Sequence, residues 1–265
     1  MSGLVAVRCL GRVAHITFTN PKKLNPMTEA VGKELRAAVQ ALDRKATSVI
    51  VLNGEGENFS AGGDLDFLRA RAASTPEQNI DTMVSFYNLF LGPLRASPFV
   101  TIAAVTGAAV GAGAALATAC DMRVVASTAK VGWTFTSGVA IHPGMGSTFF
   151  LPKAVGQQNA NRLLLGGELL SGRQLAAMGW ALEAVDDTSA VLPRAVSLAE
   201  TVAATAPAAM RETLLTLRAR DDEGLQAALQ REAEGQAVCY AGPDFLKGLD
   251  AIVSRKKPVW GQYED

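Results

Sequence analysis

Apolar and polar residues recur with two different periods in the first part of the chain. In residues 12–19 apolar side chains alternate with polar ones, as in a strand, whereas in residues 28–44 they recur every three or four positions, as on one face of a helix. An apolar run at 48–53 predicts a buried strand, residues 75–95 predict a second helix, and residues 99–105 predict a further strand. Strands that alternate with helices in this way predict an α/β core.

Helical periodicity dominates the chain beyond residue 156. The predicted elements are a strand at 182–185 and helices at 157–165, 172–178, 190–204, 207–219, 223–241 and 244–254. Many of these helices are rich in alanine and carry an apolar face, which we expect another subunit to cover. We therefore divide the chain into a core of residues 1–200 and a C-terminal helical oligomerisation region of residues 201–265.

The composition limits the partners, metal sites and location that we expect for this protein. The chain has 265 residues, of which 49% are apolar, and its 25 lysines and arginines equal its 25 aspartates and glutamates. A balanced charge gives no general attraction to nucleic acid or to an anionic membrane, so we expect neither as a partner. The cysteines (Cys9, Cys120 and Cys239) lack the spacing of metal ligands, and no basic and apolar leader opens the chain. We expect reduced thiols, no metal site and a cytoplasmic location.

Residues 99–120 carry no charge and are long enough to span a bilayer. However, the segment consists chiefly of alanine, glycine and threonine, its first half has the residues of a strand, and no basic cluster flanks it. We therefore expect no membrane span.

Two glycine-rich turns carry the strongest chemical signal. They are Ser60-Ala61-Gly62-Gly63-Asp64-Leu65 and Gly107-Ala108-Ala109-Val110-Gly111-Ala112-Gly113-Ala114-Ala115. Each follows a strand-like run and opens a helix, where amide N–H groups lack partners within the helix. Two such turns that face each other can hold one oxyanion between two N–H groups. A dinucleotide site is a poor alternative, because the position of the third glycine after Gly111 and Gly113 falls on Leu116.

Three motifs together resemble the crotonase (enoyl-CoA hydratase/isomerase) superfamily: the segment 58–65, the segment from Ala104-Val105-Thr106-Gly107 to Cys120-Asp121, and Pro143-Gly144-Met145-Gly146. The early Asn20-Pro21-Lys22-Lys23-Leu24-Asn25 is similar to the family's CoA-binding turn. The resemblance implies an α/β spiral of strand-strand-helix units with a C-terminal helical trimerisation region. It also implies a homotrimer or a dimer of trimers and an acyl-CoA substrate, with coenzyme A as part of the substrate and no separate cofactor.

Carried over position by position, the resemblance places an oxyanion hole at the backbone N–H groups of Gly63 and Ala112. The substrate-binding residues that it implies are Lys22, Lys23, Leu24, Ala61, Gly62, Asp64, Leu65, Gly111, Ala115, Phe135, Thr136 and Arg255. The cations among them suit the phosphates of CoA. The alternative for each cation is a solvated surface charge.

The chain departs from the family where hydratases carry two glutamates. The first position is Ala115, and the second falls on Phe135 or Thr136, depending on where a one-residue insertion is placed. Neither alternative is a carboxylate base, so the usual two-carboxylate addition of water is not expected. His142, next to Pro143-Gly144, is a candidate for proton transfer. The alternative is a loop histidine that bonds backbone carbonyls.

We therefore expect an enzyme of the enoyl-CoA hydratase/isomerase family, a lyase or isomerase, that binds an acyl-CoA thioester and stabilises its enolate. One alternative is a decarboxylase-like member that acts on a carboxylated acyl thioester, because Arg69 and Arg71 lie where such relatives hold a carboxylate. The other alternative is an oligomer that binds acyl-CoA without catalysis.

Overall fold

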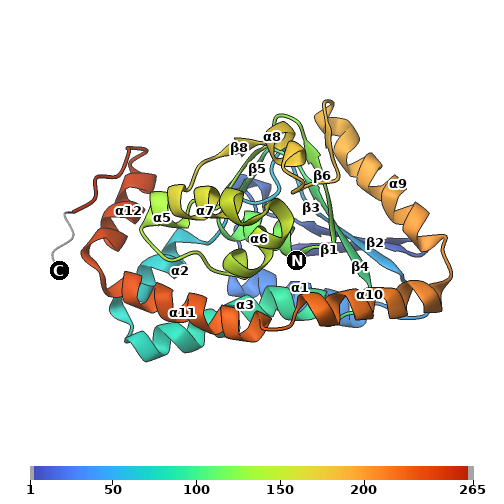
Figure 1. Cartoon of the computed structure of the whole chain (residues 1–265), viewed down its shortest axis with the longest axis horizontal. Coiled ribbons are helices and arrows are strands. Elements are labelled where there is room, and N and C mark those ends of the chain that lie inside the picture. The colour runs from blue at the N-terminus through green and yellow to red at the C-terminus, as the bar shows by residue number, and fades with distance from the viewer. Residues whose placement is uncertain (1–2, 262–265) are drawn as a thin grey trace.

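The computed structural model describes residues 3–261 and contains two sheets (Figure 1). The first is a six-stranded sheet of order β1-β2-β3-β4-β6-β9. Its strands are β1 (Val5–Leu10), β2 (Val13–Phe18), β3 (Val49–Gly54), β4 (Val100–Val105), β6 (Met122–Ala126) and β9 (Glu183–Val185). All neighbours are parallel except β1 and β2, and every residue of β3 and β4 is buried. Central strands covered on both faces explain the continuous apolar runs in the sequence.

Helices cover both sides of this sheet. Helix α9 (Val191–Ala203) contacts β3, β4 and β6, whereas α1 (Glu29–Ala41) contacts β1 and β2 and packs against α3 (Pro76–Arg95). In Figure 1 α9 lies on one side of the strands, and α1 and α3 lie on the other. Threonines begin both of these helices as predicted: the hydroxyl of Thr28 accepts from the Val31 N–H, and Thr75 forms a capping box with Gln78.

The second sheet contains three short strands, β5 (Ala108–Val110), β7 (Lys130–Gly132) and β8 (Leu170–Ser171). The chain passes from β4 in the first sheet to β5 in the second and then enters α4 (Ala112–Ala119). It repeats this path through β6, β7 and α5 (Phe135–Val139). The repeat is the strand-strand-helix unit that the family resemblance implied, and it divides the uncharged segment 99–120 into two strands and a short helix. No helix within residues 3–261 is long and apolar enough to cross a membrane.

Several elements are absent from the sequence predictions for physical reasons, as the following three show. Strand β1 lies at the sheet edge with mostly exposed side chains, so it carries no burial pattern. No helix was predicted over α5, because its five residues are too few to show a period. No helix was predicted over α6 (Ser147–Val155), which contains Pro152, a residue that is unfavourable inside a helix.

The remaining helices are mostly as predicted. They are α2 (Leu65–Ala70), α7 (Gln157–Gly166), α8 (Gly172–Ala177), α10 (Pro207–Asp221), α11 (Leu225–Ala241) and α12 (Pro243–Val253), with 3-10 turns η1 (Pro21–Lys23), η2 (Arg71–Ala73) and η3 (Thr188–Ala190). Helix α11 packs along α3, so the C-terminal region folds back over the core. The predicted division at residue 200 falls within α9 and stays a prediction.

A buried cluster of ion pairs fastens α10 to the core. Arg218 donates to both carboxylate oxygens of Asp121, at 3.0 and 2.6 Å, and Arg95 pairs with Asp121 and with Asp222. Burial acts to raise the pKa of Asp121, but the hydrogen bonds and charge of Arg218, with bonds from Thr101, hold it below its ordinary value.

The lowered pKa of Asp121 predicts a loss of stability in acid. Because the folded-state pKa lies below the unfolded-state value near 3.8, the carboxylate contributes stability above about pH 4, and this contribution is lost as the pH falls through the folded-state pKa. We expect the difference in free energy of unfolding between the wild type and Asp121→Asn to shrink as the pH falls from about 6 to 3. Urea unfolding across that range measures it, and a constant difference would contradict the assignment.

Candidate active site

The two glycine-rich turns lie against each other. The amide of Ser60 donates to the carbonyl of Ala108, and the amide of Val110 donates to the carbonyl of Ser60, both at 3.0 Å. Gly62 has a φ of 100°, and a Cβ there would lie 2.6 Å from the Val110 oxygen and 3.5 Å from the Ala112 nitrogen. A Cβ at Gly113 would lie 2.6 Å from the Ser60 oxygen. Glycine at both positions is therefore required by the close approach of the two backbones.

Each turn contributes residues to the wall of one shared cavity. Asp64 caps α2 by accepting from the Phe67 amide at 2.9 Å, and Gly111, with a φ of 53°, precedes the first residue of α4. In the described part of the chain, the amides of Gly63 and Ala112 have no intramolecular acceptor, and both residues line the cavity. Both amides lie at or just before a helix start, where the helix dipole favours negative charge.

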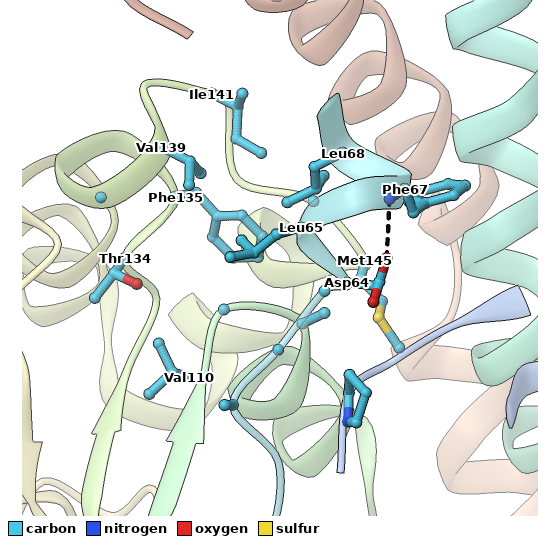
Figure 2. A pocket seen from close by; sticks show the side chains of 18 of the residues that line it. Asp64, Leu65, Phe67, Leu68, Val110, Thr134, Phe135, Val139, Ile141 and Met145 are labelled. Atoms are coloured by element: carbon cyan, nitrogen blue, oxygen red, sulfur yellow. Dashed lines mark hydrogen bonds between the residues drawn. The ribbon is translucent and has the colours of Figure 1, made fainter. Parts of the chain in front are cut away.

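The cavity next to these amides has a volume of about 920 Å³. Its walls come from α2, α3, α5, the loop 139–145 and the C-terminal helices, and most of the side chains are apolar. Figure 2 shows Leu65, Leu68 and Phe135 gathered near its centre, with Val139 and Ile141 beside them. A cavity of this size and character suits a ligand with a long apolar portion.

Two asparagines hold the site turns in register. The side chain of Asn25 accepts from the Asn20 amide and donates to the carbonyls of Glu55 and Asn58, at 2.9 to 3.0 Å. The side chain of Asn58 accepts from the Ala108 amide at 2.8 Å. These bonds join the two glycine-rich turns to residues 20–25, the turn that carries Lys22 and Lys23 and is called the lysine turn below. Sequence reasoning gave neither side chain a role, although both stand inside the quoted motifs.

The structure brings together most of the predicted site residues. Those that line the cavity are Lys23, Leu24, Ala61, Gly62, Gly63, Asp64, Leu65, Gly111, Ala112 and Phe135. They come from segments up to 112 residues apart, which the fold joins through the contacts between β2, β3, β4 and the second sheet.

Other predicted residues lie outside the cavity lining. Lys22 and Arg255 are exposed, and Ala115 is 1% exposed inside α4. The hydroxyl of Thr136 donates to the carbonyl of Leu164 at 2.9 Å. His142 packs its ring against Gly235, where a Cβ would lie 2.7 Å from it, and its Nδ1 lies 2.6 Å from the Pro143 carbonyl oxygen.

The structure distinguishes the two positions that were proposed for the second missing glutamate. Of the two alternatives, Phe135 faces the cavity and Thr136 faces α7. The carboxylates among the residues that line the cavity are Asp64, which caps α2, and Asp66. No cluster of three or more potential metal ligands occurs within residues 3–261.

The two arginines of the decarboxylase alternative do not line the cavity. Arg69 pairs with Asp250 at 2.6 Å, and Arg71 lies over the ring of Phe67, 4.9 Å from its centroid. Lys23 is the one cation among the described lining residues. A carboxylated acyl chain would therefore find little positive charge in this cavity.

A polar cluster behind the loop 143–146 was missed by sequence reasoning. Gln236 donates to the carbonyl of His142 at 2.9 Å and accepts from the Tyr240 hydroxyl at 2.7 Å. Glu232 accepts from the amides of Gly146 and Thr148 at 2.7 and 2.8 Å. Burial raises the pKa of Glu232 to about 7, although these bonds act to lower it.

Comparisons with known proteins agree in both sequence and structure. A family model described as "Enoyl-CoA hydratase/isomerase" matches residues 10–263. A putative enoyl-CoA hydratase of Thermus thermophilus is 32% identical over 249 residues, which cover 94% of this chain and 97% of that protein. The human mitochondrial methylglutaconyl-CoA hydratase is 33% identical, with 88% of this chain and 69% of that protein covered. The crystal structure of an enoyl-CoA hydratase from Mycobacterium avium subsp. paratuberculosis has a TM-score of 0.84 at 26% identity, and the match covers 98% of this chain and 99% of that one.

Proposed function

Because the chain belongs to the enoyl-CoA hydratase/isomerase family of the crotonase superfamily, we propose that the backbone N–H groups of Gly63 and Ala112 bind the carbonyl oxygen of an acyl-CoA thioester. The observation that carries this proposal is the pair of N–H groups without intramolecular acceptors, on two turns in contact, at the wall of a large apolar cavity. An apolar chain fills such a cavity, and the two donors match the charge that develops on the thioester oxygen.

The chemical role of the two donors is to stabilise an enolate. As a bond at the α carbon breaks, negative charge moves to the carbonyl oxygen, and donors already in place stabilise this charge without rearranging. Apolar surroundings strengthen the interaction because water does not screen it. Backbone donors make the side chains of Gly63 and Ala112 less important than the closeness of the two turns.

The CoA portion is proposed to lie toward the lysine turn. Lys23 lines the cavity, Lys22 precedes it in η1, and Asn25 fixes this turn to the site. Both lysines, with Arg255 from the C-terminal segment, suit the phosphates of CoA. Exposed apolar side chains on the C-terminal helices support assembly into a homotrimer or a dimer of trimers; they are Leu215, Leu217, Val238, Leu246, Ile252 and Val253.

The reaction class follows from the side chains near the two donors. Alanine at 115 and phenylalanine at 135 argue against addition of water by a pair of glutamates. We favour a step that depends mainly on the oxyanion site and in which water takes part. One is a double-bond shift, in which water takes a proton from the α carbon and a proton is returned to the γ carbon. The other is hydrolysis of the thioester, in which water adds to the carbonyl carbon and CoA leaves. His142 keeps its ring against α11, so the proposal gives it no proton-transfer role.

Isotope exchange tests the proposal directly. We expect the purified protein to bind butyryl-CoA and to speed exchange of its α hydrogens with deuterium oxide, followed by mass spectrometry. Crotonyl-CoA and a 3-enoyl-CoA are supplied in parallel. Fast hydration of crotonyl-CoA would contradict our interpretation of Ala115 and Phe135, and failure to bind any acyl-CoA would overturn the proposed function.

A non-catalytic acyl-CoA binder is the second candidate. It is favoured by the same observation that argues against hydration, the absence of a carboxylate at positions 115, 135 and 136. Tight binding across a panel of acyl-CoA thioesters, with neither exchange nor turnover, would select this candidate over the enzyme.

A further inference from the structure

Tyr87 carries a hydroxyl group whose hydrogen-bonding capacity is unused. Its side chain is 1% exposed on α3, it lines the cavity, and its hydroxyl has no hydrogen-bond partner in the described structure. Burial raises its pKa well above the ordinary value, so the phenol is neutral and can donate. A buried polar group without a partner lowers stability, so its presence requires an explanation.

Gln236 brings a second donor to the same part of the cavity wall. A Cβ at Gly144 would lie 2.4 Å from the Tyr87 hydroxyl and 2.6 Å from Nε2 of Gln236, so the two polar atoms flank one point beside Gly144. The Gln236 amide uses one N–H on the His142 carbonyl, and its oxygen accepts from Tyr240. These two bonds fix the amide orientation and leave the other N–H of Nε2 without a partner in the described structure.

Glycine at 144 allows both polar side chains to pack closely against the loop. All three residues (Tyr87, Gly144 and Gln236) line the cavity, and any larger side chain at 144 would clash with both polar atoms and displace them. The wall is otherwise largely apolar. A paired polar feature at one place in an apolar wall is the usual means by which a binding site orients a ligand.

The charges near this feature exclude an anionic group on the ligand. Glu232, when ionised, places a negative charge near Tyr87, and the carboxylates of Asp64 and Asp66 belong to the same cavity. Arg71 is held over the ring of Phe67, outside the lining. A carboxylate placed here would lose its water without gaining a counter-ion, whereas a hydroxyl or a carbonyl oxygen needs only a donor.

We propose that Tyr87 and Gln236 form a subsite for a neutral oxygen, a hydroxyl or carbonyl group carried on the acyl chain, so that the substrates are oxygenated rather than plain or carboxylated acyl thioesters. This inference rests on the proposed binding of acyl-CoA. It assigns the specificity of the cavity, and it is independent of which reaction the oxyanion site performs.

Direct binding measurements test the subsite. Dissociation constants are measured by calorimetry for hexanoyl-CoA, for hexanoyl-CoA analogues with a hydroxyl on each carbon from the third to the sixth, and for adipoyl-CoA. We expect at least one hydroxylated analogue to bind the wild type about tenfold tighter than hexanoyl-CoA, and adipoyl-CoA to bind more weakly than hexanoyl-CoA. Tyr87→Phe is expected to abolish the preference while leaving the affinity for hexanoyl-CoA within about twofold.

Thr134→Val is the matched control, because it replaces the hydroxyl of another residue of the cavity lining by a methyl group. It is expected to keep the preference. The melting temperature of Tyr87→Phe is expected to equal or exceed that of the wild type, because no internal hydrogen bond is lost. Equal binding of all six ligands, or loss of the preference in Thr134→Val instead, would overturn the subsite alone. Absence of binding by hexanoyl-CoA and every analogue would overturn the proposed function, and the subsite with it.

Discussion

Replacement of Ala112 by proline is expected to lower kcat/KM by about a hundredfold to a thousandfold for whichever acyl-CoA reaction the protein performs. Proline lacks the backbone N–H that we assign to the oxyanion site, and its ring would stand where the thioester oxygen binds. Removal of one such donor from an oxyanion site costs about 3–4 kcal/mol of transition-state stabilisation. The measurement is steady-state kinetics on the best substrate of the panel.

The fold tolerates proline at this position. Ala112 is the first residue of α4, where proline is favoured, and its N–H makes no intramolecular bond in the described structure. Gly111, at φ 53° and ψ −119°, lies outside the helical region that a following proline disfavours. The melting temperature is therefore expected to change little.

Ala112→Gly is the matched control for the kinetic experiment. It changes the side chain but keeps the N–H, so it is expected to retain at least about a tenth of the wild-type kcat/KM. Wild-type kinetics in a folded Ala112→Pro protein would show that this amide does not bind the reacting oxygen. Equal losses in the proline and glycine variants would point instead to a role for the side chain.

Replacement of Arg218 by alanine is expected to lower the free energy of unfolding by about 3–5 kcal/mol. Arg218 is 4% exposed, and besides Asp121 its guanidinium donates to three backbone carbonyls, those of Arg95, Ser97 and Phe99. Without it, these carbonyls and part of the Asp121 carboxylate remain buried without donors. Urea unfolding at about pH 7 measures the loss.

Arg69→Ala is the control for this experiment, because its pair with Asp250 is exposed. We expect that variant to lose less than about 1 kcal/mol. If Arg218→Ala also lost less than about 1 kcal/mol, the buried cluster would not be what fastens α10 to the core. Acyl-CoA affinity is expected to be unchanged in Arg69→Ala.

Local sequence signals predicted most of the secondary structure. The period of apolar residues located helices such as α1, α3 and α9, and threonines at 28 and 75 marked helix starts, because a helix and its cap depend on residues a few positions apart. Elements too short to repeat a pattern, such as α5 and β5, were not predicted. Edge strand β1 was hidden because no face of it is deeply buried.

The candidate site was predicted in part. The glycine-rich turns predicted a close approach of the two segments, because glycine allows backbone contacts that larger side chains would block. The assignment of the Gly63 and Ala112 N–H groups to an oxyanion site came from the family resemblance and stays a prediction. The sequence left Phe135 and Thr136 as alternatives, and only the packing of α5 against α7 turned Phe135 to the cavity. Tyr87 and Gln236 carried no local signal, since one resembles an ordinary apolar-face residue of α3 and the other a surface residue of α11.

The sequence by itself determined the family, the paired turns and the absence of the two glutamates, since these depend on residue identity and short spacing. The tertiary structure decided which side chains share the cavity and which point elsewhere. In the folded chain His142 packs against α11, Ala115 is buried, and the hydroxyl of Tyr87 lies beside Gly144 without a hydrogen-bond partner in the described structure. Such choices depend on contacts between segments distant along the chain, and a one-dimensional pattern does not encode the direction in which a side chain points once helices pack.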